Sequence, residues 1–352
     1  MFMQRTLRIL GCLVAAVALA ATANSQTVRI LGRSKIEPDG GFSIQWPASG
    51  FEATFEGTTL EASIYDWGSN WLNIEIDGVI SKLALGEGSQ TYTLFKGARG
   101  THTVRVTRRT GTDVGVTTFE KVKSDGRLQP TTTPERRILV IGDSFASGHG
   151  VEGANQSCSY SYDTQNADLA FPAILARSFD ADLHVVAADG RGLIRNYAGD
   201  QPAMNAIAWQ TLAEGETAWA ALAYQPQVIV VNLGTSDFTE SDPGASFEDA
   251  YVLMLRRLRQ AYPEALIVGS IGGSLWGKRY VAAKTAISDA VGLINRDGDK
   301  TVRFVEFKLT AGPGRYGCDF HPGKRAQTEM ATDLAYEIEK SIGWKSPLKS
   351  LD

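Results

Sequence analysis

Histidine and cysteine are scarce in this sequence of 352 residues, which contains four of the first and three of the second. Nowhere do histidines, cysteines and carboxylates follow one another with the spacing of metal ligands, so we expect no metal and no other cofactor. An excess of positive charge is missing too: the formal net charge is −4, which argues against nucleic acid as a partner. The remaining composition, with 43% apolar and 21% charged residues, is ordinary for a soluble globular protein.

The sequence has no long apolar run at its start: the apolar stretch over residues 9–21 is too short to cross a membrane as a helix. Two arginines precede this stretch and small residues follow it near Ala23 and Ser25, which is the order of a secretory signal peptide. We therefore predict a signal peptide over residues 1–25, export to the periplasm or out of the cell, and no membrane partner. Its removal takes away two cations and no acid, which makes the net charge −6.

Two cysteines then remain, Cys158 and Cys318. An isolated pair in an oxidising compartment often forms a disulfide. Two unrelated buried thiols are the alternative that cysteine counting leaves open.

The length suggests two domains, and two regions differ in their pattern of apolar residues and turn formers. Residues 27–124 contain short alternating segments such as Leu60–Ile64, Leu72–Ile76 and His102–Val106. Turn formers such as Asp77-Gly78 and Arg99-Gly100 bound them, which predicts a β-sandwich or jelly-roll domain. Residues 125–136 carry two prolines and no apolar pattern, so we expect a linker. Residues 137–345 alternate apolar strands with helical stretches, which predicts a three-layer α/β/α domain around a parallel sheet.

The second region allows its elements to be placed. We expect strands at 138–141, 183–187, 228–233, 266–271 and 302–307, and a helix over about 324–342. The clearest further helix puts Phe247, Tyr251, Met254, Leu255, Leu258 and Tyr262 on one face. Because sites in such sheets gather at the carboxyl ends of strands, Ser144 in Gly142-Asp143-Ser144 is a candidate nucleophile. A plain strand-to-helix turn is the alternative.

A nucleophilic serine needs a base, usually imidazole. His321 is the best of the four histidines, because its loop precedes the last helix and should return to the strand ends. His102 lies in a strand of the first domain and His184 on the amino side of the sheet. His149 is close to Ser144, but a helix beginning after the serine would direct it away, so we expect it to shape the pocket loop.

Four short motifs together resemble the blocks of the SGNH (GDSL) hydrolase superfamily. They are Gly-Asp-Ser at 142–144, Asp-Gly-Arg-Gly at 189–192, Gly-Thr-Ser-Asp at 234–237 and His-Pro at 321–322. With the preceding β domain, the longer segments 192–197, 232–238 and 317–322 resemble carbohydrate esterase family 2. This resemblance implies a jelly-roll domain joined to an SGNH domain, and removal of acetyl groups from sugars in xylan and related polysaccharides.

The resemblance also implies roles for residues. Ser144 would be the nucleophile and His321 the general base, and the backbone N–H groups of Ser144 and Gly190 would line an oxyanion hole, with Gly192 as the alternative donor. One departure is Ser236, which stands where the superfamily has an asparagine whose amide is an oxyanion donor.

A second departure concerns the acid. The superfamily has an aspartate three residues before the histidine, where this chain has Cys318, and Asp319 lies only two residues before it. We expect either a Ser–His dyad oriented by a backbone carbonyl or a triad with a displaced Asp319. A disulfide between Cys158 and Cys318 would tie the histidine loop to the loop after the serine, and we predict that it forms.

Aromatic residues are candidates for sugar binding. Trp276 follows the strand at 266–271 and would either stack on a sugar ring or plug its loop against the core. The turn Asp66–Trp71 would be a sugar platform or a packed turn, and Asp237 is expected to anchor a loop through backbone hydrogen bonds.

The leading hypothesis is a secreted serine esterase that deacetylates a carbohydrate. One alternative is an SGNH esterase for peptidoglycan O-acetyl groups or small lipid esters, although no long apolar lid is present to favour lipids. Another is a catalytically impaired carbohydrate-binding protein. The sequence does not indicate an oligomeric state.

Overall fold

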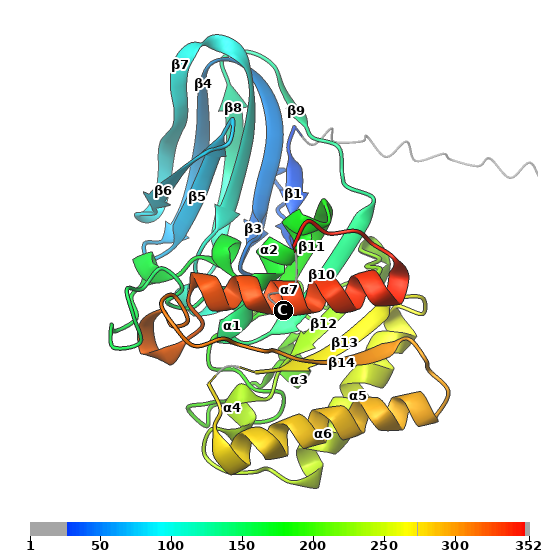
Figure 1. The fold of residues 1–352 in the computed structure, drawn as a ribbon. Helices are drawn as coiled ribbons and strands as arrows, with labels where there is room; N and C mark the ends of the chain where they lie inside the picture. Colours follow the sequence, from blue (N-terminus) through cyan, green and yellow to red (C-terminus); the bar gives the residue numbers. More distant parts are fainter. Residues whose placement is uncertain (1–26, 273, 349–352) are drawn as a thin grey trace, which may run out of the picture.

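The computed structural model describes residues 27–272 and 274–348, so the predicted signal peptide lies outside the described residues. Figure 1 shows an antiparallel β domain, blue to cyan, above an α/β domain that carries the long helices. This is the two-domain architecture predicted from the sequence.

Nine strands of the described chain form the β domain, in the order β2-β3-β8-β4-β7-β5-β6, with β1 and β9 paired to β4. Their bounds are β1 Arg29–Leu31, β2 Lys35–Ile36, β3 Phe42–Ile44, β4 Gly50–Trp67, β5 Trp71–Ile76, β6 Val79–Ala84, β7 Glu87–Arg108, β8 Thr117–Ser124 and β9 Leu128–Pro130. The predicted turn at Asp77-Gly78 joins β5 to β6, and both residues have positive φ, as a tight hairpin requires.

Two strands are longer than the sequence predicts. Arg99-Gly100 is expected to bound a strand, yet β7 runs through it for 22 residues beside the 18 residues of β4. Gly57 and Gly100 face each other across this pair, and the register shifts just after Gly57. The turn formers thus mark an irregularity within continuous strands, because glycine accommodates a bulge without ending the pairing.

The segment expected to be a linker, residues 125–136, contains β9, which pairs with β4 at Ala53–Phe55. Its last residue, Arg136, opens the first strand of the α/β domain. The chain therefore passes between the domains along the edge of the β sheet.

The α/β domain has a five-stranded parallel sheet in the order β11-β10-β12-β13-β14. The strands are β10 Arg136–Gly142, β11 Ala181–Ala187, β12 Val228–Asn232, β13 Leu266–Ile271 and β14 Val302–Glu306. Each matches a predicted strand within two residues. The runs of Val, Ile and Leu in β10, β12 and β13 are buried because helices cover both faces of the sheet.

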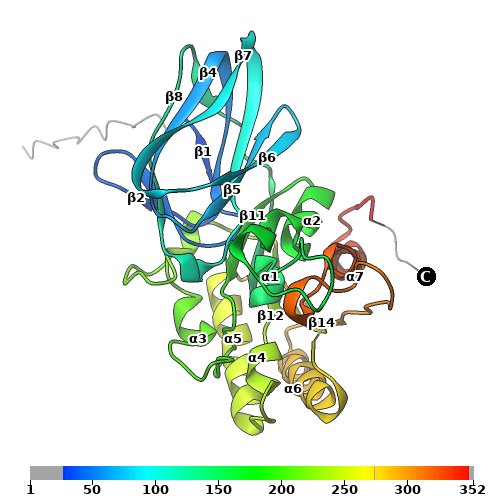
Figure 2. The ribbon, with the colours of Figure 1, turned by 90° about the vertical axis from the view of Figure 1, so that its left-hand side faces the viewer.

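Helices α1 Ser144–Ser147, α2 Phe171–Ser178 and α7 Lys324–Ile342 pack on one face. Helices α3 Met204–Ile207, α4 Thr235–Phe238, α5 Ala245–Ala261 and α6 Gly277–Arg296 cover the other, as Figures 1 and 2 show. The predicted apolar face of α5 is buried against the sheet. Short 3₁₀ turns lie at η1 Thr112–Val114, η2 Tyr162–Thr164, η3 Ala167–Leu169, η4 Ala221–Ala223 and η5 Cys318–Phe320.

Buried polar contacts fasten the two domains together. The indole N–H of Trp46, a fully buried residue of the β domain, donates to the Thr211 carbonyl at 3.0 Å. The buried Arg33 guanidinium donates to the Ala208 carbonyl at 2.8 Å. Because such groups are costly to leave unpaired in a buried interface, the domains are held in one arrangement.

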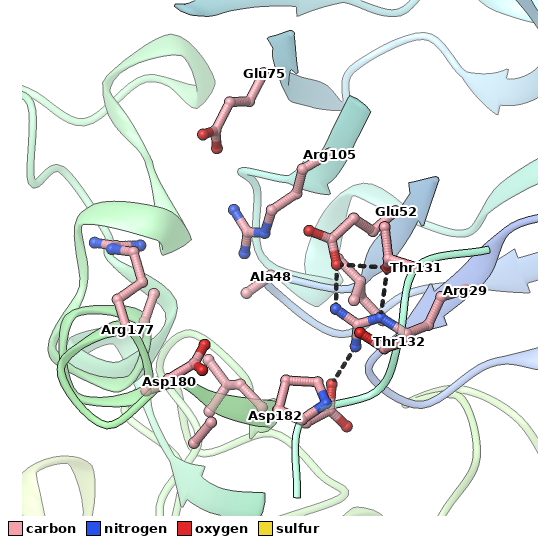
Figure 3. A pocket seen from close by; sticks show the side chains of 16 residues that line it. Arg29, Ala48, Glu52, Glu75, Arg105, Thr131, Thr132, Arg177, Asp180 and Asp182 are labelled. Carbon is pink, nitrogen blue, oxygen red and sulfur yellow. Dashed lines mark hydrogen bonds and ion pairs between the residues drawn. The ribbon is translucent and has the colours of Figure 1, made fainter. Parts of the chain in front are cut away.

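Figure 3 shows a cavity of about 450 Å³ between the domains, at the amino end of β11. Several of its charged side chains are paired: Arg29 pairs with Glu52 and Asp182, which also line the cavity, and Arg105 pairs with Asp168 outside it. Ser144 follows the carboxyl end of the neighbouring strand β10, so this cavity lies away from the expected site. No helix within residues 27–272 or 274–348 is long and apolar enough to cross a membrane.

Candidate active site

Ser144 lies where β10 meets α1, at the carboxyl edge of the sheet. Asp143 caps the helix by accepting a hydrogen bond from the Phe145 N–H at 3.0 Å. Ser144 is therefore the first residue of a one-turn helix, with 9% of its surface exposed. Successive strands β11 and β12 flank β10 on opposite sides, and such a switch point is where open α/β sheets bind ligands.

His321 meets the serine from the loop that precedes α7. Its Nε2 lies 2.8 Å from Ser144 Oγ. Burial lowers the pKa of His321 to about 4, and the charge of His149 acts in the same direction. The imidazole is therefore neutral at neutral pH, which is the form that can accept the serine proton.

Asp319 approaches His321 with its backbone. The Asp319 carbonyl oxygen lies 3.1 Å from His321 Nδ1, whereas the Asp319 carboxylate accepts a hydrogen bond from the Tyr160 N–H at 3.0 Å. The observed arrangement is therefore the expected Ser–His dyad oriented by a backbone carbonyl. The alternative, a triad with Asp319, is not formed, because the Asp319 carboxylate does not contact the imidazole.

Backbone N–H groups are available where an oxyanion would form. Among the described residues, the N–H groups of Ser144 and Gly190 have no hydrogen-bond partner. The N–H of Gly192, the alternative donor, is occupied by Asn196 Oδ1 at 3.2 Å. Gly190 has a φ of +68°, a conformation that glycine adopts without strain, so the chain can turn there directly after β11.

Ser236 lies in α4, directly after β12, and is buried. Its hydroxyl makes no hydrogen bond within the part of the chain that the structure describes. The nearby buried amide of Asn232 does not replace the missing asparagine, because its Nδ2 donates to the Ser270 carbonyl at 3.3 Å. Of the two residues, only Ser236 therefore has a side-chain donor that is not already used, at the carboxyl edge of the sheet where Ser144 lies.

Asp237 organises the loop after β11. Its carboxylate accepts hydrogen bonds from the backbone N–H groups of Leu193 and Ile194, both at 2.8 Å, and of Arg195 at 2.9 Å. The expected anchoring role is present, and the anchored loop is the one that carries Gly190. Burial raises the pKa of Asp237 against the effect of these bonds.

Cys158 and Cys318 form the predicted disulfide. Backbone bonds reinforce it: Cys318 N–H donates to the Gly150 carbonyl at 3.0 Å, and Asp319 N–H donates to the Cys158 carbonyl at 3.1 Å. A Cβ at Gly153 would lie 2.3 Å from Cys318 Sγ, so only glycine fits there. The bridge therefore ties the histidine loop to the segment that follows α1.

The expectation that His149 is directed away from the site is wrong. Helix α1 ends at Ser147, and Gly148, with a φ of +74°, reverses the chain. The ring of His149 consequently lies 4.2 Å from that of His321, between centroids, and its Nδ1 lies 2.9 Å from Asp189 Oδ2. Sequence reasoning missed this pair; its only signal was an aspartate directly before Gly190.

The other two histidines are remote from the serine. His102 bonds Asp77 in the β domain at 2.6 Å, and His184 is buried against Tyr224 with ring centroids 3.6 Å apart. Among the residues that the structure describes, no three His, Cys, Asp or Glu side chains are grouped to hold a metal ion.

Exposed aromatic rings lie beside the loops that carry His321 and Gly190. Trp276 is 54% exposed and packs edge-on against Phe320, the neighbour of His321. Tyr197, 64% exposed, donates its N–H to the Gly190 carbonyl at 2.8 Å. The alternative in which Trp276 packs its loop against the core is therefore wrong, because more than half of the residue is exposed.

In the turn Asp66–Trp71, the side chains of Asp66 and Asn70 are buried and bonded to each other at 2.9 Å. Trp67 between them is 60% exposed. The segment is thus a packed turn that presents one exposed indole.

Two family models match the chain. The carbohydrate esterase 2 N-terminal model matches residues 30–134, and the GDSL-like lipase/acylhydrolase family model matches residues 140–327. The sheet, the Gly-Asp-Ser turn and the second match together define an esterase of the GDSL acylhydrolase class.

A solved structure narrows this class. A family two carbohydrate esterase from Clostridium thermocellum, in complex with cellohexaose, is 32% identical with a TM-score of 0.87, and the match covers 90% of this chain and 100% of that one. The chain belongs to carbohydrate esterase family 2.

Curated relatives agree with this assignment. The cellulase/esterase CelE of Acetivibrio thermocellus is 32% identical over 319 residues, which cover 89% of this chain and 39% of CelE; the chain thus spans less than half of that relative's length. An acetylxylan esterase / glucomannan deacetylase of Cellvibrio japonicus is 26% identical over 92% of this chain and 91% of the relative.

Proposed function

We propose that this chain hydrolyses O-acetyl esters on a polysaccharide of the xylan or glucomannan type, with Ser144 as nucleophile and His321 as general base. The observation that carries the proposal is the 2.8 Å contact between Ser144 Oγ and His321 Nε2. The similarity to known proteins supports the substrate class, because a relative that matches over nearly the whole chain is named acetylxylan esterase / glucomannan deacetylase.

The reaction proceeds in two halves. His321 Nε2 accepts the Ser144 proton as Oγ attacks the acetyl carbonyl carbon, and the resulting oxyanion accepts hydrogen bonds from the N–H groups of Ser144 and Gly190. His321 then gives the proton to the sugar oxygen, which leaves as a hydroxyl while Oγ keeps the acetyl group. Water, deprotonated by His321, attacks this ester, and acetate leaves as the serine is restored.

The exposed aromatics support a sugar substrate. Trp276, Phe320 and Tyr197 offer flat apolar faces next to His321 and Gly190. Exposed apolar groups gathered at one site mark a binding surface, and flat rings suit the faces of pyranoses. The Cys158–Cys318 disulfide supports an oxidising compartment, in keeping with the export predicted from the sequence.

Hydrolysis of 4-nitrophenyl acetate and of acetylated xylan by the purified protein tests the proposal. We expect Ser144→Ala and His321→Ala each to lower kcat by about 10³-fold or more, with His102→Ala in the remote β domain as the unchanged control. Trp276→Ala should raise KM for acetylated xylan and leave the small ester unaffected.

Other outcomes would replace the proposal. Hydrolysis that survives Ser144→Ala would remove the serine mechanism. Activity on O-acetylated peptidoglycan or a short lipid ester, without activity on xylan, would assign another ester. Binding of xylan without any turnover would leave a carbohydrate-binding protein.

A further inference from the structure

A second histidine–carboxylate pair lies beside the proposed base. His149 Nδ1 is 2.9 Å from Asp189 Oδ2. The rings of His149 and His321 have centroids 4.2 Å apart and a tilt of 37°, and His149 also stacks on Tyr160 with centroids 3.8 Å apart and a tilt of 12°. The imidazole of His149 is therefore held in place by three neighbours, one of which is the base.

Asp189 is built to remain a carboxylate. It accepts hydrogen bonds from the Ser147 hydroxyl and from Gln165 Nε2 at 3.0 Å. Although burial opposes ionisation, the bonds from His149 and Ser147 hold the pKa of Asp189 below its usual range. An ionised Asp189 accepts the Nδ1–H of His149, which leaves His149 Nε2 free to take up a proton.

Other charges reach the pair from several elements. A Cβ at Gly111 would lie 2.8 Å from Asp113 Oδ1 and 3.2 Å from Asp189 Oδ2, so the η1 turn of the β domain places a second carboxylate next to the first. The titratable groups that face His149 are Asp189, Asp113, Tyr160 and His321. Behind these lie Asp319 beside His321, Tyr162 beside Tyr160, and the buried Arg108 beside Asp113 and Tyr160. Carboxylates thus lie where they balance a positive charge on His149.

We propose that His149 and Asp189 are a positioning pair that keeps His321 in its unprotonated form, facing Ser144, at acidic pH. The ring of His149, itself stacked on Tyr160, packs against the His321 imidazole and restricts its rotation. A proton held on His149 by Asp189 puts a positive charge beside His321 and opposes a second proton there. When His149 is neutral, the charge of Asp189 instead stabilises the imidazolium that His321 becomes during proton transfer. This inference rests on the proposed role of His321 as base.

The titration of His321 tests the pair without requiring turnover. We would follow the imidazole resonances by NMR in the parent protein and in His149→Phe, which keeps a stacked ring and removes the charge. The midpoint for His321 should rise by about one pH unit. The matched control is His102→Phe, which breaks another His–Asp pair, that with Asp77, far from the serine and should leave the His321 midpoint unchanged.

The pH profile of kcat/KM gives the second readout. In His149→Phe the acidic limb should move to higher pH, with a loss of about tenfold on the acidic side and little change on the alkaline side. His149→Gln, which is neutral and can still bond Asp189, should show the same shift if His149→Phe fails to fold.

An unchanged or lowered His321 midpoint in the folded variants would overturn the inference, whatever happens to activity. A raised midpoint in a protein that hydrolyses no ester would instead retain the pair and contradict the proposed function. The two failures are therefore distinguishable.

Discussion

The imidazole of His321 is oriented by the backbone of Asp319. The Asp319 carbonyl oxygen lies 3.1 Å from His321 Nδ1, and the carboxylate of the same residue turns to the Tyr160 N–H at 3.0 Å. A carbonyl selects the tautomer with a proton on Nδ1, as a triad carboxylate does, but it contributes no full negative charge to stabilise an imidazolium.

This geometry predicts that Asp319→Asn is mild. The substitution retains both the carbonyl and an oxygen that can accept from Tyr160 N–H, and asparagine tolerates the φ of +51° at this position. We expect kcat for 4-nitrophenyl acetate to fall by less than about tenfold, compared with about 10⁴-fold where a triad aspartate is lost. A fall of the larger size would assign Asp319 the role of the triad acid.

Ser236 is expected to act as a third oxyanion donor, because its hydroxyl makes no hydrogen bond within the described chain and the residue follows β12 at the edge where Ser144 lies. Ser236→Ala should lower kcat by about 10²-fold with little change in KM. Ser236→Asn, which supplies an amide donor at the same position, should keep kcat at or above the parent value. Ser246→Ala, an exposed serine on α5, is the control. Unchanged turnover in Ser236→Ala would mean that backbone N–H groups alone form the hole.

The disulfide should contribute strongly to stability. It joins residues 160 positions apart, and chain-entropy models give about 5 kcal/mol for a loop of this length. The double variant Cys158→Ser, Cys318→Ser should lose a free energy of unfolding of this order in urea titrations. Dithiothreitol should destabilise the parent protein and leave the double variant unaffected. A loss near zero would show that the bridge positions the loops without stabilising the fold.

Asp143 should make stability depend on pH. Burial raises its pKa to about 7, and the nearby charges of Asp189 and Asp237 add to this. The folded state therefore binds a proton that the unfolded state has released, so this group's contribution is full below pH about 4 and is lost as the pH rises to about 7.

Asp143→Asn stays neutral and keeps an acceptor for the Phe145 N–H. Its free energy of unfolding relative to the parent should therefore rise across this window, by up to about 4 kcal/mol. Urea titrations at several pH values measure this difference. Asp242→Asn, at an exposed site, should show no comparable trend, and a parallel pH dependence of the parent and Asp143→Asn would contradict the assignment.

The sequence by itself determined the elements whose signal is local. The buried runs of Val and Ile gave the parallel strands within two residues, because a strand covered on both faces needs an apolar residue at every position. The apolar period of Phe247 to Leu258 likewise located α5. Two cysteines left in a chain expected to be exported, together with the family resemblance, predicted the disulfide. Three motifs at strand ends and one in a late loop predicted that Ser144 and His321 lie at one edge.

The tertiary structure decided what depends on single backbone angles. The two-residue spacing of Asp319 and His321 permits either a carboxylate or a carbonyl contact, and the positive φ of Asp319 selects the carbonyl. His149 joins the site because Gly148 ends α1 after one turn. Arg99-Gly100 reads as a turn in the sequence, yet Gly100 lies inside the long strand β7, where it pairs with Gly57 of β4 across the sheet. In each case a local pattern fits two conformations, and the long-range contacts that choose between them exist only in the folded chain.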